Sequence, residues 1–113
     1  MQLEYTEQEN TIRLIKLTGM LDIMGANEID TRFAAYCSGE KALVLVDLTN
    51  INYLASIGIR LLTSNAKSLA SRGGKLVLFN PNDDVRSVLD TTGILTIIPT
   101  FDQVEAAEAA LLA

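Results

Sequence analysis

The chain has 113 residues, 49% of them apolar, which is enough to bury the core of one domain spanning residues 1–113. Nine basic against fourteen acidic residues leave a formal net charge of −5, which disfavours nucleic acid as a partner because phosphates bind basic surfaces. The absence of His and the presence of a single Cys, Cys37, exclude Ser-His-Asp and Cys-His catalysis, the commonest zinc sites and an internal disulfide.

The N-terminal residues carry an early acid, Glu4, and lack the basic and apolar regions of a secretory signal. Uninterrupted apolar runs such as residues 42–46 are far shorter than the roughly 18 residues of a membrane span. We therefore expect a cytoplasmic protein with no membrane span.

Two strands are predicted near the N-terminus. Residues 11–17 alternate polar and apolar, which predicts a half-buried strand with Ile12, either Leu14 or Ile15, and Leu17 near its buried face. Residues 3–7 are expected to pair with it as an edge strand.

Three further strands follow along the chain. Residues 42–46 and 75–79 are continuous apolar runs rich in β-formers, which predicts central strands covered on both faces. Ile97 and Ile98, just before Pro99, are long enough only for a terminal strand. Helical patterns occupy residues 27–36, 56–72, 83–92 and 102–112.

The resulting order is β-β-α-β-α-β-α-β-α. Strands that alternate with helices of this length indicate an α/β fold with a mainly parallel sheet of four to five strands and about four helices.

The longest predicted helix begins at Ser56, which we expect to act as its N-cap, since serine is a favoured residue there. At 100° per residue, a polar stripe is predicted to run along this helix. Its members are Ser56, Arg60, Thr63, Lys67 and Ser71. Two cations on one stripe of an acidic protein make this stripe a candidate contact surface.

Three segments in order resemble the bacterial anti-sigma factor antagonists of the STAS domain family. They are residues 47–62, with Tyr-Leu-Ala-Ser-Ile-Gly-Ile-Arg at positions 53–60; residues 17–22, Leu-Thr-Gly-Met-Leu-Asp; and residues 72–78, which enter a strand through Gly73-Gly74. The resemblance covers nearly the whole chain and implies a single STAS domain.

The resemblance also implies a function. The protein is expected to antagonise an anti-sigma factor with serine kinase activity, to be switched off by phosphorylation on Ser56, and to be restored by a serine phosphatase. Transcription would thus be regulated by partner switching. The residues expected to contact the partner are Asp22, Ala55, Ser56, Ile57, Gly58, Arg60, Thr63 and Lys67.

A second interpretation stays open, because family members commonly have an acid before the serine and a hydroxyl residue after it. Here Ala55 and Ile57 occupy those positions. The alternative is a constitutive STAS adaptor that is never phosphorylated, such as a scaffold in a signalling complex or an accessory subunit of a transporter. Asp22 likewise has two interpretations, as a partner contact or as a local turn cap.

No enzymatic activity is expected, because neither a glycine-rich nucleotide-binding motif nor residues at metal-ligand spacing are present. We therefore predict no catalytic residues, no cofactor and no metal. Asp47 is interpreted as fixing a loop, and Asn82 or Asp83 as capping a helix. Cys37 is expected to pack in the core with no basic neighbour to lower its pKa.

Overall fold

A computed structural model describes the whole chain, residues 1–113, and confirms the predicted element order. A short 3-10 helix over Ile94–Thr96 is the one additional element. The strands are β1 (Gln2–Glu7), β2 (Arg13–Leu21), β3 (Leu43–Leu54), β4 (Lys75–Phe79) and β5 (Thr100–Phe101). The helices are α1 (Ile23–Tyr36), α2 (Ser56–Ser71), α3 (Asp83–Thr91) and α4 (Val104–Leu112).

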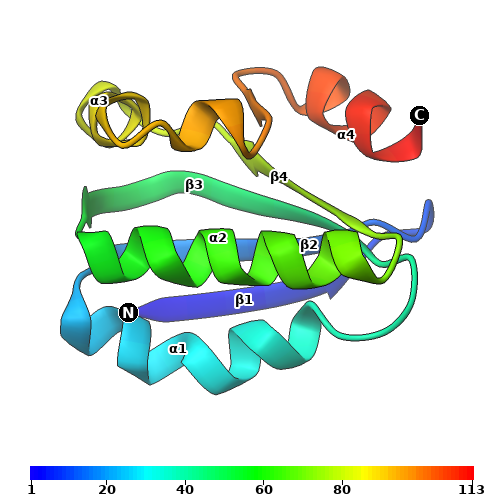
Figure 1. Cartoon of the computed structure of the whole chain (residues 1–113), viewed down its shortest axis with the longest axis horizontal. Coiled ribbons are helices and arrows are strands. Elements are labelled where there is room, and N and C mark those ends of the chain that lie inside the picture. The colour runs from blue at the N-terminus through cyan, green and yellow to red at the C-terminus, as the bar shows by residue number, and fades with distance from the viewer.

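The strands form one five-stranded sheet in the order β1-β2-β3-β4-β5. β1 pairs antiparallel with β2, and every later pair is parallel. Figure 1 shows α1 and α2 side by side along β1 to β3, whereas α3 and α4 lie above β3 and β4. Because β2 and β3 are parallel, they end at the same edge of the sheet, where α1 and α2 begin.

Hydrophobic residues fill both faces of the sheet. Val44 and Val46 belong to a large cluster to which α1, α2 and α3 contribute, while Leu45 between them belongs to a smaller cluster with Ala107 and Leu111 of α4. Since successive side chains of a strand point to opposite faces, α4 covers the face opposite to α1 and α2. The prediction that residues 42–46 and 75–79 are covered on both faces is confirmed.

The prediction of one buried face for residues 11–17 is wrong. Ile12 is fully buried in the smaller cluster, whereas Ile15 and Leu17 are fully buried in the larger one. Apolar residues therefore line both faces of this segment because β2 pairs with β1 on one side and β3 on the other and carries helices on both faces.

β3 runs well past its predicted apolar stretch, to Leu54. The register between β2 and β3 is irregular at one point: Lys16 pairs with Asp47, but Thr18 pairs with Asn50. Asp47 lies at the start of this irregularity. One carboxylate oxygen of Asp47 accepts hydrogen bonds from the backbone N–H of Thr49 at 2.9 Å and from its hydroxyl at 2.5 Å. Asp47 therefore fixes the local backbone, as expected, but inside β3 and not in a loop.

The terminal strand lies at Thr100–Phe101, so its prediction at Ile97–Ile98 is wrong. Leu78 donates its N–H to the carbonyl of Pro99 at 2.9 Å, and the next bond of this parallel ladder would need an N–H at residue 99. Proline has none. The pairing of β4 with β5 therefore begins only at Leu78. The earlier residues of β4 have no neighbouring strand on that side.

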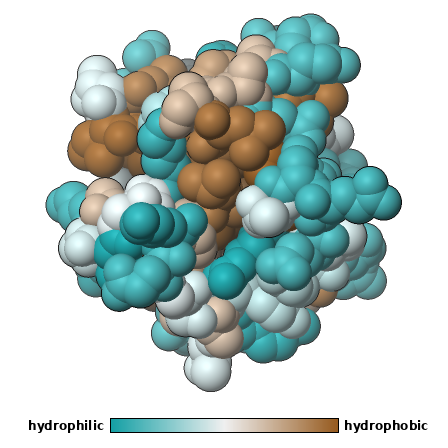
Figure 2. All heavy atoms as spheres, turned by 90° about the vertical axis from the view of Figure 1, so that its right-hand side faces the viewer, coloured by the Kyte–Doolittle hydropathy of each residue, from teal (hydrophilic) through white to brown (hydrophobic).

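An apolar groove of about 400 Å³ lies along this free edge, between Ala66 and Ala70 of α2 and Ala110 of α4. Figure 2 shows the end of the molecule where α4 finishes and β4 begins, with hydrophobic atoms near the middle and hydrophilic atoms around them. Hydrophobic surface is therefore exposed along this groove.

Two helix starts are capped by side chains. Asp22 accepts a hydrogen bond from the N–H of Gly25 at 2.8 Å, and Asn82 accepts one from Val85 at 2.8 Å. The cap at Asp22 starts α1 at Ile23, four residues before the predicted start at Asn27. Asn82, one of the two predicted caps, is the N-cap of α3.

Cys37 is buried, as predicted, but the prediction that it has no basic neighbour is wrong. Arg13 and Arg72 lie close enough to lower its pKa, although burial dominates and raises the pKa of the thiol to about 12. The two guanidinium groups hold the loop after α1: Arg13 donates to the carbonyls of Tyr36 and Ser38, and Arg72 to those of Cys37 and Gly39.

Candidate functional site

Ser56 is the first residue of α2 and lies exposed at the end of β3. The expectation that it caps the helix is wrong, because the N-cap is Ala55 and no side chain caps the helix. The chain passes directly from the strand end at Leu54 through Ala55 into the helix, so Ser56 falls one residue inside it. Its hydroxyl makes no hydrogen bond within the chain and is free to react or to meet a partner.

The first turn of α2 packs tightly on the strands below it because residue 58 is glycine. A Cβ atom at Gly58 would lie 2.7 Å from Leu21 Cγ, 2.8 Å from the Leu21 carbonyl oxygen and 2.9 Å from Leu54 Cδ1. Any side chain there would push the helix away from β2 and β3. Gly58 is buried, so its close contacts are with this chain's own strands.

The first turn of α1 also packs closely on the end of a strand because it contains a glycine, Gly25. A Cβ atom at Gly25 would lie 2.1 Å from the Met20 carbonyl oxygen. Asp22, two residues after Met20, caps this helix, which confirms the interpretation of Asp22 as a local turn cap. Its role as a partner contact remains a prediction.

An exposed apolar surface surrounds these two helix starts, and sequence reasoning missed it. Met20 is the next-to-last residue of β2 and lies directly opposite Tyr53 of β3, and Ile23 and Met24 open α1. Their exposed fractions are 49% for Met20, 50% for Tyr53, 64% for Ile23 and 74% for Met24. We call these four residues the apolar rim of Ser56. Large apolar side chains gathered at one exposed edge make this edge a candidate protein contact surface.

One signal in the sequence could have revealed the rim. Ile23 and Met24 follow the capping Asp22 and precede Gly25 and Ala26, which are the first buried residues of α1. Two consecutive large apolar residues in an exposed first turn do not fit a helix that buries a single face.

The polar stripe predicted on α2 is present. Ser56, Arg60 and Lys67 are exposed, whereas Thr63 is half-buried and its hydroxyl donates to the carbonyl of Ile59 at 2.8 Å. Ala55 and Ile57 are half-buried, and Ile57 packs against the large core cluster. The exposed residues of the stripe are thus Ser56, Arg60, Lys67 and Ser71.

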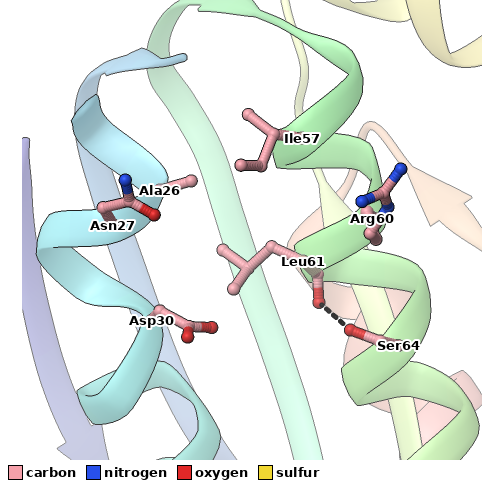
Figure 3. A pocket seen from close by; sticks show the side chains of 7 residues that line it. All are labelled: Ala26, Asn27, Asp30, Ile57, Arg60, Leu61 and Ser64. Atoms are coloured by element: carbon pink, nitrogen blue, oxygen red, sulfur yellow. Dashed lines mark hydrogen bonds between the residues drawn. The ribbon is translucent and has the colours of Figure 1, made fainter. Parts of the chain in front are cut away.

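A small cavity of about 150 Å³ lies between α1 and α2, next to this stripe. Figure 3 shows Asn27 and Asp30 of α1 on one side of it, and Ile57, Arg60 and Ser64 of α2 on the other. The carboxylate of Asp30 and the guanidinium of Arg60 form no ion pair across it. Arg60 therefore keeps its charge available to a group outside the cavity.

No group of three His, Cys, Asp or Glu side chains is placed to hold a metal ion. Nor does any helix combine the length and apolarity needed to cross a membrane. The features gathered at this edge are a free hydroxyl and an apolar rim, with Arg60 one helical turn along α2.

Comparison with known proteins agrees with this description. The sequence model of the STAS domain family matches residues 2–107. The protein BtrV of Bordetella bronchiseptica, which is named as an anti-sigma factor antagonist, is 33% identical over 94 residues, covering 83% of this chain and 81% of BtrV.

Solved structures share the fold at lower identity. An anti-sigma factor antagonist from Mycobacterium paratuberculosis matches with a TM-score of 0.88 at 16% identity, covering 99% of this chain and 94% of that one. The Bacillus protein SpoIIAA, solved in its phosphorylated form, matches with a TM-score of 0.72 at 18% identity, covering 96% and 99% of the two chains.

Proposed function

The chain belongs to the STAS domain family, and from this membership we propose that it acts as an anti-sigma factor antagonist switched by phosphorylation. It binds an anti-sigma factor when Ser56 is unmodified. The serine kinase activity of that factor phosphorylates Ser56, and the phosphorylated protein then dissociates from the anti-sigma factor. A serine phosphatase removes the phosphate and restores binding. The sigma factor is free to act only while the unmodified antagonist occupies its inhibitor.

The observation that carries this proposal is the placement of Ser56. Its hydroxyl is exposed, makes no hydrogen bond within the chain and lies at the edge where the apolar rim is exposed. A contact surface with a free hydroxyl at its edge suits a kinase that is also the binding partner. The names of BtrV and of the M. paratuberculosis protein, and the phosphorylated form of SpoIIAA, support the same function.

A phosphate at Ser56 can switch binding without changing the fold. It adds about −1.5 to −2 charges at pH 7, and the first turn of a helix stabilises negative charge through the helix dipole. Gly58 packs closely against Leu21 and Leu54, and this packing keeps the first turn of α2 in place. In a complex, the same charge would face the partner across desolvated apolar surface, where unpaired charge is costly. The partner is therefore released because the charge destabilises the interface, and no change of the fold is needed.

The test is to incubate the purified protein with ATP and candidate anti-sigma factors of the same genome and to measure its intact mass. The parent protein should gain the mass of one phosphate group, and Ser56→Ala should gain none. Ser71→Ala is the matched control, because Ser71 lies on the same stripe at the other end of α2, and it should be phosphorylated as the parent is.

Binding measured beside the mass separates the two functions. Stable binding to a partner with no phosphate on Ser56 would contradict the switch and support the constitutive adaptor, in agreement with Ala55 and Ile57 beside the serine. Phosphate on the Ser56→Ala protein would show that another residue is the acceptor.

A further inference from the structure

Arg60 lies one helical turn after Ser56, on the same exposed stripe of α2. Four residues advance a helix by about 6 Å, so side chains at these positions are neighbours on its surface. A negative charge at the earlier position and a positive charge at the later one is the favourable order for such a pair. Phosphorylated Ser56 and Arg60 would have this order.

The guanidinium of Arg60 has no partner within the chain. Arg13, Arg72 and Arg86 each donate side-chain hydrogen bonds, to backbone carbonyls, a hydroxyl or a carboxylate, whereas Arg60 forms neither a side-chain hydrogen bond nor an ion pair. Figure 3 shows its side chain directed along α2 toward the N-terminal turn, away from Asp30. This is the usual direction of long side chains in helices.

Backbone donors at the start of α2 are also free. The N–H groups of Ser56 and Ile57 precede the first backbone bonds of the helix, which are donated by Gly58 and Ile59 to the carbonyl of Ala55. The absence of a capping side chain leaves these donors open. A phosphate on Ser56 would thus have free N–H groups near it and a free guanidinium one turn away.

The other charged groups around Ser56 are mostly acidic. α1 contributes Asp22 at its cap and Asp30 at the cavity, and α3 contributes Asp84 beside the end of β3. Lys67, the second cation of the stripe, lies eleven residues after Ser56, which is about 16 Å along the helix and beyond the screening length of physiological salt. Arg60 is therefore the cation of α2 that can neutralise a phosphate at this position.

We propose that Arg60 binds the phosphate group of phosphorylated Ser56 within the same chain, an inference that rests on the proposed function. Arg60 then has two alternative partners: an acidic group of the anti-sigma factor in the unmodified protein, and the phosphate after modification. Phosphorylation both adds negative charge to the contact surface and withdraws a positive charge from it.

The experiment requires no kinase. Phosphoserine is introduced at position 56 during translation, in the parent, Arg60→Gln and Lys67→Gln backgrounds, and the second ionisation of the phosphate is followed by phosphorus NMR across pH. Arg60→Gln should raise the midpoint by about 0.3 pH unit or more, because loss of a neighbouring cation disfavours the dianion. Lys67→Gln removes the same charge and should leave the midpoint unchanged.

Two further measurements complete the test. Arg60→Lys should restore most of the parental midpoint, since it restores the charge. In concentrated urea, where the helix is lost, the difference between parent and Arg60→Gln should disappear. Equal midpoints for parent and Arg60→Gln in the folded state, or equal shifts for Arg60→Gln and Lys67→Gln, would overturn the proposal. Because the phosphate is installed directly, these results are independent of whether a kinase modifies Ser56, which the intact-mass experiment decides.

Discussion

The backbone N–H of Ala55 donates a hydrogen bond of 3.0 Å to the carbonyl oxygen of Leu21. Ala55 immediately precedes Ser56, and Leu21 immediately precedes Asp22, so this bond joins the residues that lead into α2 and α1. The starts of the two helices are thereby held in one arrangement, with Gly58 packed against Leu21 from above. A modification at Ser56 acts on a surface whose backbone is already fixed.

Ser56→Asp should imitate phosphorylation only in part. Aspartate brings about one negative charge where phosphate brings nearly two, so affinity for the anti-sigma factor should fall to a value between those of the parent and the phosphorylated protein. Thermal stability should equal or slightly exceed the parental value, because an acid in the first turn of a helix is stabilised by about 0.3–1 kcal/mol. Weaker binding accompanied by a clearly lower Tm would contradict a switch that acts through the interface.

Met24→Gln should weaken binding without affecting the fold. Met24 is 74% exposed and lies in the apolar rim. If it is central to the contact, its replacement should cost about 1 kcal/mol or more of binding free energy, whereas the free energy of unfolding should change by less than about 0.5 kcal/mol. Titration calorimetry and thermal unfolding measure the two quantities.

Ile97→Gln is the matched control for that variant, because Ile97 is 54% exposed and lies by the groove beside β4. Its affinity should equal that of the parent. A loss of affinity in Ile97→Gln with none in Met24→Gln would place the contact at the groove.

Replacing Arg60 and Lys67 together by Glu should slow association with an acidic partner more than it speeds dissociation. Exposed charges act mainly on the rate of encounter, and salt screens them. The difference from the parent should therefore shrink as salt is raised in stopped-flow measurements. Arg32→Glu with Lys41→Glu makes the same charge change at exposed residues off this stripe and should have a smaller effect. Equal association rates for parent and stripe variant would exclude the stripe from the interface.

Gly58→Ala should destabilise the protein by about 1–3 kcal/mol, the usual cost of forcing extra volume into a packed site. Its Cβ atom would meet a carbonyl oxygen and two side chains at less than 3 Å. Ser64→Ala introduces the same residue six residues further along α2 at an exposed position and should be neutral or slightly stabilising. Chemical denaturation of the two variants measures the difference, and a parental stability for Gly58→Ala would show that the helix can shift without cost.

Cys37 should be unreactive toward thiol reagents at neutral pH until the protein unfolds, because burial raises the pKa of its thiol from 9.0 to about 12. The unfolded chain loses this proton near pH 9 and the folded chain only near pH 12, so the contribution of the thiol to stability is complete below pH 9 and is lost as the pH rises toward 12. Cys37→Ala should lose less stability between pH 9 and 12 than the parent. Rapid labelling of the folded protein at pH 7 would contradict a buried thiol.

Much of the fold could be predicted from the pattern of apolar residues, and the errors have local causes. Period-two alternation located β2 and by itself puts residues 12 and 15 on opposite faces of the sheet, but it could not show that both faces are covered by helices. The helix α1 starts at Ile23 and not at Asn27 because the side chain of Asp22 caps it there. This cap outweighs the low helix propensity of Gly25.

The candidate site was predicted less completely than the fold. The exposed stripe followed from helical spacing, since Ser56, Arg60 and Lys67 share one side of a single helix. The apolar rim did not, because Met20 and Tyr53 lie far apart in the sequence and meet only through the register of β2 and β3. The cap at Ser56 was assigned wrongly because the strand before it ends one residue earlier than a capping serine requires.

The coverage of one face of the sheet by α4 alone bears on what the rest of the fold can do without it. Ile12, Leu45 and Val77 pack against Ala107 and Leu111 of α4, whereas the other three helices contribute to the large cluster on the opposite face. A chain truncated after Phe101 would keep every strand and three helices but would expose one apolar face of its sheet to water, to other copies of the chain or to a chaperone.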